Sequence, residues 1–132
     1  MRKLRGITAI LLAAVIAISS TGIITYAVTK TFKIQYSVSG NFTAPANNCS
    51  YSISAYIVDY NDNIYDNTSH HYEMTIYSGL ITKFDQQFTT GKTWNGSLSL
   101  SKDKKYGIKF INNDSISTSN YVSGSCTITK NS

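Results

Sequence analysis

Apolar and polar positions alternate along most of the chain after residue 27. In the clearest case, which begins at Cys49, apolar residues occupy every second position and serines fill the first three positions between them. Because successive side chains of an extended strand point to opposite faces, this pattern predicts a half-buried strand from Cys49 to Tyr60. From Tyr56 onward the second set of positions also becomes apolar, with Val58 and Tyr60, so we expect this strand to lie centrally in a sheet.

Six further segments repeat the period of two. They cover residues 32–38, 72–76, 84–88, 94–100, 105–112 and 121–129. Residues typical of turns separate them, and no segment after residue 27 has a helical period. The pattern therefore predicts an all-β fold, an antiparallel β-sandwich of about seven strands in two sheets. Within the first segment, Tyr36 shares the positions of Phe32 and Ile34 and is expected in the core.

The first 27 residues have the order of a signal peptide. Basic residues at 2, 3 and 5 precede an apolar run from Ile7 to Ile18, and small residues lead to Ala27. This order predicts an N-terminal signal helix, cleavage after Ala27, and a secreted domain over residues 28–132. The alternative is an uncleaved membrane anchor, because Ile23 and Ile24 extend the apolar run toward the roughly 20 residues that cross a bilayer. Polar residues 19–21 interrupt that extension, so no stable membrane span is expected after cleavage.

The net charge of +5 belongs mostly to the leader. The whole chain has 12 basic and seven acidic residues, and removal of the leader leaves nine basic against seven acidic. A nucleic-acid partner is not expected, since nucleic-acid-binding domains carry strong basic clusters. The cluster Lys102, Lys104 and Lys105 is interrupted by Asp103 and is typical of a solvated turn. The remaining 105 residues (132 minus 27) fit one domain.

Two cysteines, Cys49 and Cys126, fall on core positions of an early and a late strand. In an exported protein a disulfide persists, and we predict that these two residues form one that contributes about 4 kcal/mol. Two separate buried thiols are the alternative. The arrangement resembles the immunoglobulin fold in architecture only. That fold has a Trp on the strand after the first Cys and a Tyr two residues before the second, whereas Trp94 lies far downstream of Cys49 and Gly124 precedes Cys126. The abundance of Asn, Lys, Ile and Tyr is similar to that of small exported proteins of low-GC Gram-positive bacteria.

Motifs for catalysis are missing from the sequence. There is no G-x-S-x-G or H-E-x-x-H, and the Gly91-Lys92-Thr93 segment lacks the earlier glycine and the following helix of a phosphate-binding loop. His70 and His71 are adjacent, so in a strand they point to opposite faces and do not share an ion. These observations favour a protein that is not an enzyme.

The loop after the central strand is a weak calcium candidate. Three of its residues match the opening of a calcium-binding loop, and two aspartates add oxygen ligands; the set is Asp59, Asn61, Asp62, Asn63 and Asp66. The EF-hand pattern is not completed, because Ile64 and His70 stand where it requires Gly and Glu. The alternative is that these residues only form turns. No other cofactor is expected.

Tyrosine is abundant, with nine of ten residues after position 27. Five of them lie in loops or at non-core positions and are the candidate binding surface, together with the loop from Asn61 to Thr68: Tyr56, Tyr60, Tyr65, Tyr77 and Tyr121. Amphipathic rings suit binding surfaces, although they also cover sheet faces. We therefore expect a secreted, non-enzymatic binding module for an extracellular protein or glycan. A matrix protein assembling through edge strands, and a secreted toxin or inhibitor, are the alternatives.

Overall fold

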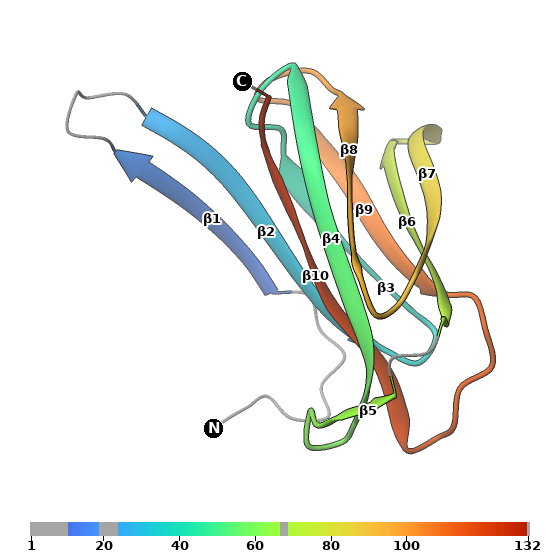
Figure 1. Ribbon diagram of the computed structural model, residues 1–132. Helices are drawn as coiled ribbons and strands as arrows, with labels where there is room; N and C mark the ends of the chain where they lie inside the picture. Colours follow the sequence, from blue (N-terminus) through green and yellow to red (C-terminus); the bar gives the residue numbers. More distant parts are fainter. Residues whose placement is uncertain (1–10, 19–23, 67–68, 132) are drawn as a thin grey trace.

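A computed structural model describes residues 11–18, 24–66 and 69–131 (Figure 1). These residues form ten strands in two antiparallel sheets that face each other, which confirms the predicted all-β sandwich. No helix in the described ranges is long and apolar enough to cross a membrane.

The first sheet has the order β1-β2-β10-β4-β5, and β8 also pairs with β4. As predicted, β4 is central, because it pairs with three neighbours. The strands of this sheet are β1 (Leu11–Ile18), β2 (Ile24–Ile34), β10 (Asn120–Lys130), β4 (Asn48–Asp59), β5 (Ile64–Asp66) and β8 (Thr93–Ser99).

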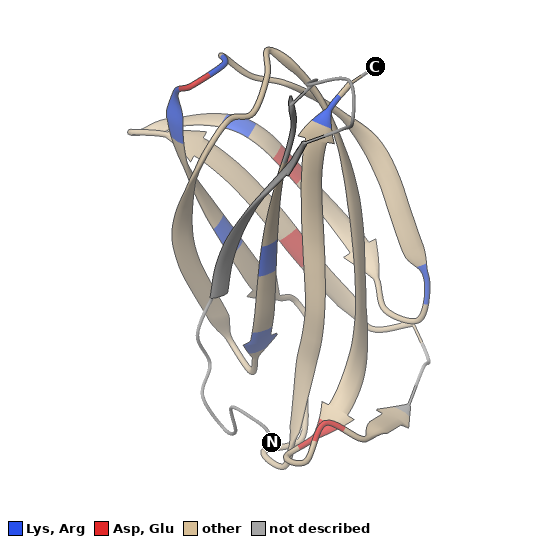
Figure 2. Ribbon diagram, turned by 90° about the vertical axis from the view of Figure 1, so that its left-hand side faces the viewer, with Lys and Arg blue, Asp and Glu red and all other residues tan. Residues whose placement is uncertain are grey.

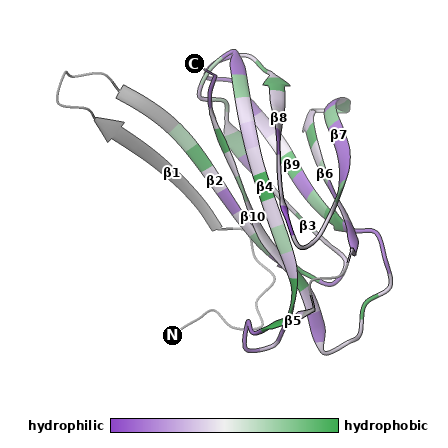
Figure 3. Cartoon of the chain, viewed as in Figure 1, coloured by the Kyte–Doolittle hydropathy of each residue, from purple (hydrophilic) through white to green (hydrophobic). Residues whose placement is uncertain are grey.

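The second sheet has the order β3-β9-β6-β7. Its strands are β3 (Ser37–Thr43), β9 (Lys105–Asn112), β6 (His71–Ser78) and β7 (Ile81–Thr89). Hydrophobic and hydrophilic residues alternate along several strands (Figure 3). The buried hydrophobic residues of both sheets form one core cluster. Phe32 of β2 stacks on Phe110 of β9 with ring centroids 4.1 Å apart, and Tyr72, Phe88 and Tyr51 continue the aromatic contacts. Complete burial of each such side chain contributes about 1.5–3 kcal/mol.

The predicted first strand is in fact two strands that belong to different sheets. The chain turns at residues 35–36, so β2 lies in the first sheet and β3 in the second. Tyr36 is consequently 80% exposed, and its expected core position was wrong. The alternation gives no sign of this turn, because the inward residues Ile34 before it and Phe42 after it are an even number of positions apart, as in one continuous strand.

The predicted signal helix is not found in the described part of the leader. Leu11–Ile18 instead forms β1, which pairs with β2. This segment is rich in aliphatic residues, Ile and Val among them, and it completes the ladder along the open edge of β2. Pairing of β2 with β10 begins at Ala27. Cleavage after Ala27 stays a prediction, and it would leave that ladder intact from Val28 onward.

The predicted disulfide between Cys49 and Cys126 was wrong: both cysteines are buried free thiols. They lie on adjacent strands, but Cys126 pairs with Ile53, four residues along β4 from Cys49. Four residues of strand span about 13 Å, whereas a disulfide needs Cα atoms within about 7 Å. Alternation identified the buried face correctly but carries no information on register. Burial raises the pKa of Cys126 to about 12.

Candidate functional site

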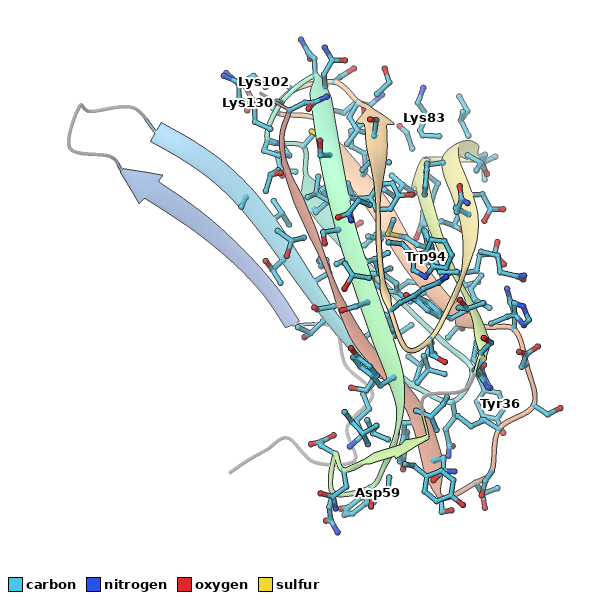
Figure 4. All side chains as sticks on the ribbon, viewed as in Figure 1. Tyr36, Asp59, Lys83, Trp94, Lys102 and Lys130 are labelled. Carbon is cyan, nitrogen blue, oxygen red and sulfur yellow. The ribbon has the colours of Figure 1, made fainter. Side chains whose placement is uncertain are left out.

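One end of the sandwich gathers the most exposed tyrosines. Here β2, β4 and β9 end and β3, β6 and β10 begin, and Figure 4 shows Tyr36 and Asp59 at this end. We call it the tyrosine end, defined by Tyr36, Tyr60, Tyr65 and Tyr121. Tyr60 and Tyr65 are exposed by 55% and 67%, and Tyr121 is half-buried.

A hollow of about 440 Å³ opens beside Tyr36. Its walls come from the turn between β2 and β3 and from the loop between β9 and β10. Amide, hydroxyl and carboxylate groups dominate, with one aliphatic side chain, and the lining residues are Gln35, Tyr36, Asn112, Asn113, Asp114, Ser115, Ile116 and Thr118. A largely polar hollow beside an exposed aromatic ring can bind a molecule that carries both apolar and hydroxylated faces.

Asn112 fixes the shape of this hollow. Its side-chain amide donates to the carbonyl of Gln35 at 2.8 Å, and its Oδ1 accepts from the main-chain N–H of Asp114 at 3.3 Å. The same Oδ1 accepts from the Nε2 of His70. Gln35 in turn donates to the carbonyls of Thr118, at 2.7 Å, and Asn120, at 3.1 Å. Both walls of the hollow are therefore connected through two side chains.

The two histidines hold the loop between β9 and β10. The main-chain N–H and the Nδ1 of His71 both contact the Oδ2 of Asp114, at 2.7 and 2.8 Å, and His70 contacts Asn112. These contacts, led by the main-chain N–H of His71, lower the pKa of Asp114. The two histidines thus have different hydrogen-bond partners, Asn112 for His70 and Asp114 for His71.

Lys33 ties the loop after β4 to β2. Its Nζ donates to the carbonyl of Tyr60 at 3.1 Å and to the Oδ1 of Asp62 at 2.6 Å. The ammonium also lies 4.9 Å from the centre of the Tyr121 ring and 5.8 Å from that of Tyr60. The Lys33 side chain is only 11% exposed, against 55% for Asp62. The Lys33 ammonium therefore neutralises part of the negative charge of the loop after β4.

Two of the proposed calcium ligands, Asp59 and Asp62, accept hydrogen bonds from the protein itself. Asp59 Oδ1 accepts from the main-chain N–H groups of Asn61, at 2.8 Å, and Asn63, at 3.0 Å, and Asp62 pairs with Lys33. The Asn63 N–H is the largest cause that lowers the pKa of Asp59. Asp66 closes β5, which the loop prediction did not include. Within the described ranges, no three His, Cys, Asp or Glu residues cluster as a metal site. Calcium binding stays a prediction, and it would have to displace Lys33.

The five tyrosines of the predicted surface do not form one patch. Tyr60, Tyr65 and Tyr121 lie at the tyrosine end, and Tyr56 is half-buried on β4, paired with Ser123. Tyr77 lies on β6 of the second sheet. Residues 67–68 of the predicted loop lie outside the described residues.

Tyr77 covers the main chain of the second sheet. A Cβ on its cross-strand neighbour Gly107 would lie 2.3 Å from the Tyr77 ring, so only glycine permits this packing. On the same sheet Glu73 shares a hydrogen bond with Asp85, which raises the pKa of Glu73. This face meets the hollow at Asn113, whose Nδ2 donates to the Oε1 of Glu73 at 3.1 Å and to the Oε1 of Gln87 at 2.9 Å.

The sequence interpretation missed the residues of the hollow, above all Tyr36 and Asn112. Tyr36 has core parity, and Asn112 stands at the end of a strand among other turn-forming residues. The only signal was the group of amide and hydroxyl residues from Asn113 to Asn120, which was interpreted as a loop after the strand that ends at Asn112.

Comparisons with known proteins give structural matches only. No protein-family model matches the chain, and no match is found among curated proteins. A family two carbohydrate esterase from Cellvibrio japonicus matches with a TM-score of 0.43 and 8% identity over 96% of this chain, which spans 32% of that protein. The CBM36-1 domain of a multidomain xylanase from the hindgut metagenome of Trinervitermes trinervoides matches with a TM-score of 0.44, 6% identity, and coverage of 95% and 91%. PliG of Aeromonas hydrophila, a periplasmic inhibitor of g-type lysozyme, matches with a TM-score of 0.39, 12% identity, and coverage of 84% and 90%.

Proposed function

We propose that this protein is a secreted, non-enzymatic binding module that recognises a glycan at its tyrosine end. The observation that carries the proposal is the position of Tyr36, 80% exposed beside a hollow of about 440 Å³ lined by amide, hydroxyl and carboxylate groups. Binding pockets for small molecules measure about 300–1,000 Å³, so this hollow admits one or two sugar rings.

The chemistry of the hollow is complementary to a sugar. A pyranose ring has an apolar C–H face that packs on an aromatic ring, and it carries hydroxyl groups at its edge that both donate and accept hydrogen bonds. Tyr36 offers the ring, and the Asp114 carboxylate and the Thr118 hydroxyl group lie close by. The Nδ2 of Asn113 already donates to Glu73 and Gln87, so Asn113 offers its Oδ1 as an acceptor. A carboxylate that accepts from a hydroxyl group forms a stronger hydrogen bond than a neutral acceptor.

The walls of the hollow are ordered before any ligand arrives. Gln35 and Asn112 connect the two loops through hydrogen bonds, and His71 holds Asp114. Loops that are already ordered lose less conformational entropy on binding, which favours affinity. The site therefore suits recognition without a large conformational change.

The same residues give no support to catalysis. His71 and Asp114 form a pair that in hydrolases orients a base, but a nucleophile must also contact the other ring nitrogen. The main-chain N–H and the Nδ1 of His71 both contact the Oδ2 of Asp114, on the loop between β9 and β10. The pair instead holds a loop, which agrees with a binding module.

Secretion is proposed from the leader and from Lys30. Lys30 of β2 is 2% exposed and belongs to the inward row of Phe32 and Ile34, and burial lowers its pKa. Inward-pointing charges are a feature of edge strands, where they prevent pairing with other chains. β2 becomes an edge strand only when β1 is removed, so Lys30 fits a chain that begins at Val28. The intact mass of the exported protein tests this boundary.

Affinity electrophoresis and calorimetry with purified cell-wall and plant glycans test the binding site. We expect one neutral glycan to bind, and Tyr36→Ala to weaken binding at least tenfold because the stacking surface is lost. Asp114→Asn retains the shape of the side chain and removes its charge, so a smaller loss is expected. Tyr65→Ala is the matched control, since Tyr65 is similarly exposed but does not line the hollow.

The outcome also separates a glycan from a protein partner. If no glycan binds and a secreted protein is captured through Tyr60 and Tyr65 instead, the hollow is not the site. Equal losses for Tyr36→Ala and Tyr65→Ala would also count against the hollow.

A further inference from the structure

The end of the sandwich opposite the tyrosine end carries unpaired lysines. Figure 4 shows Lys83, Lys102 and Lys130 at this end, and Figure 2 shows basic segments spread across it, one of them beside the C-terminus. We call it the lysine end, defined by Lys83, Lys102, Lys104, Lys105 and Lys130. All five side chains are exposed. In the described part of the chain, none forms an ion pair, and Asp103 is the acidic residue of the turn that carries Lys102 and Lys104. The Nζ of Lys104 lies 5.6 Å from the centre of the Tyr106 ring.

A hydrogen-bonded framework brings Lys102 and Lys130 to the same hollow. The main chain of the loop at 44–48 bonds to that of the loop at 100–104 through Ala44 and Asn47, and Asn48 accepts from the N–H of Asn131 at 2.8 Å. The hollow measures about 400 Å³, and amides and the two lysines make up most of its lining. Two neighbouring ammonium groups with no acidic partner create a local positive potential that favours anions.

The hairpin between β6 and β7 adds an apolar tip at the same end. Ser78 pairs with Ile81, so Gly79 and Leu80 form a two-residue turn. Gly79 has a φ of +60°, which suits the first central position of a type II′ turn and favours glycine there. Leu80 is fully exposed and Ile81 is 64% exposed. The turn therefore presents two aliphatic side chains to solvent next to Lys83.

Exposed aliphatic residues and unpaired lysines together suit one kind of partner. We propose that the lysine end docks onto an anionic lipid surface, with the tip at Leu80 and Ile81 entering the apolar boundary and the lysines contacting phosphate headgroups. Basic residues near an anionic bilayer are attracted to it, and aliphatic side chains gain by leaving water. The exposed tip favours a lipid surface over a soluble polyanion, which offers aliphatic residues no apolar environment.

The docking geometry is compatible with the proposed glycan site. The two ends face opposite directions, so a molecule docked through its lysine end presents Tyr36 away from the membrane (Figure 4). The proposal does not depend on the glycan site, since the two ends share no lining residue.

Vesicle co-sedimentation of the full chain tests this proposal. The probes are vesicles of phosphatidylcholine alone and vesicles of phosphatidylcholine and phosphatidylglycerol in equal parts. We expect binding to the anionic vesicles that weakens as salt increases. Leu80→Asn is expected to lower the partition coefficient about tenfold, and the double change Lys102→Gln and Lys130→Gln about 25-fold.

Matched controls come from the rest of the surface. Ile64→Asn removes an aliphatic side chain that is 62% exposed at the tyrosine end, and Lys109→Gln removes a lysine from the middle of β9. Both controls are expected to bind anionic vesicles like the parent. Equal losses for Leu80→Asn and Ile64→Asn would overturn the proposal. Equal binding to neutral vesicles by all variants would assign binding to the leader and also overturn it. Binding to soluble polyphosphate without binding to vesicles would overturn it in favour of a soluble polyanion.

Discussion

The two ends of the sandwich use their charged side chains in opposite ways. At the tyrosine end, charged groups are part of the framework: Lys33 pairs with Asp62, and His71 contacts Asp114. At the lysine end, the framework consists of main-chain hydrogen bonds and neutral side chains, such as Asn47, which accepts from the N–H of Lys102 at 2.7 Å.

Charged side chains that are paired within the protein therefore differ from those that can bind an external ligand. The charges of the tyrosine end already have partners within the protein, so binding there relies mainly on rings, amides and hydroxyl groups, with the Asp114 carboxylate as the one charged group of the hollow. The lysines of the lysine end have no acidic partner among the described residues and remain available to an external anion. Similar residue types therefore predict different ligands at the two ends.

The strongest way to separate the two ends is to remove one asparagine from each. Asn112→Ala leaves the Gln35 carbonyl, the Asp114 N–H and the His70 ring without their partner, so we expect a loss of about 2 kcal/mol in unfolding free energy. Asn47→Ala removes one side-chain acceptor from an exposed loop and is expected to cost at most about 1 kcal/mol. Urea unfolding measures both. Equal losses would show that the ends are not held differently.

The fold was predictable because alternation survives in the central strands of both sheets, as in β4 and β6. Cys49, Ile53 and Ile57 of β4 are all buried, as their parity requires. Register was not predictable, since it depends on which strands pair, and the disulfide prediction failed for that reason. The turn at Tyr36 was not predicted for a related reason. The inward residues before and after it, Ile34 and Phe42, are both at even-numbered positions, so the alternation continues across the turn.

For the candidate site, the sequence predicted that exposed tyrosines take part but not which residues form the hollow. Tyr60 and Tyr65 are exposed as expected, whereas the hollow depends on side chains from segments far apart in the chain, such as Gln35 and Thr118. A tyrosine at a core-parity position cannot be distinguished from a buried one until the turn next to it is known. The pairing of Lys33 with Asp62 depends equally on the positions of β2 and the loop after β4.

Acid is expected to loosen the tyrosine end and to leave the lysine end unchanged. The pKa values of Asp59 and Asp114 are lowered by hydrogen bonds from the N–H groups of Asn63 and His71. A lowered pKa means that these bonds stabilise the fold fully above the unfolded value of about 3.9, and that the contribution is lost as pH falls through the folded value. Hydrogen exchange from about pH 5 to about pH 2 should show reduced protection of these two amides. The Lys102 amide is the internal control, because its acceptor does not titrate.

The smallest expected effect is on stability when the lysine end is neutralised. The double change Lys102→Gln and Lys130→Gln is expected to alter the unfolding free energy by no more than about 0.5 kcal/mol, because neither ammonium has an acidic partner to lose. Lys33→Gln, by contrast, removes the hydrogen bonds to Tyr60 and Asp62 and is expected to cost about 1 kcal/mol, a value that allows for the exposure of Asp62. Thermal unfolding at low and high salt distinguishes the two, since salt should reduce only the Lys33 effect. If neutralising Lys102 and Lys130 costs as much as losing Lys33, those lysines serve the framework, and the contrast between the two ends does not hold.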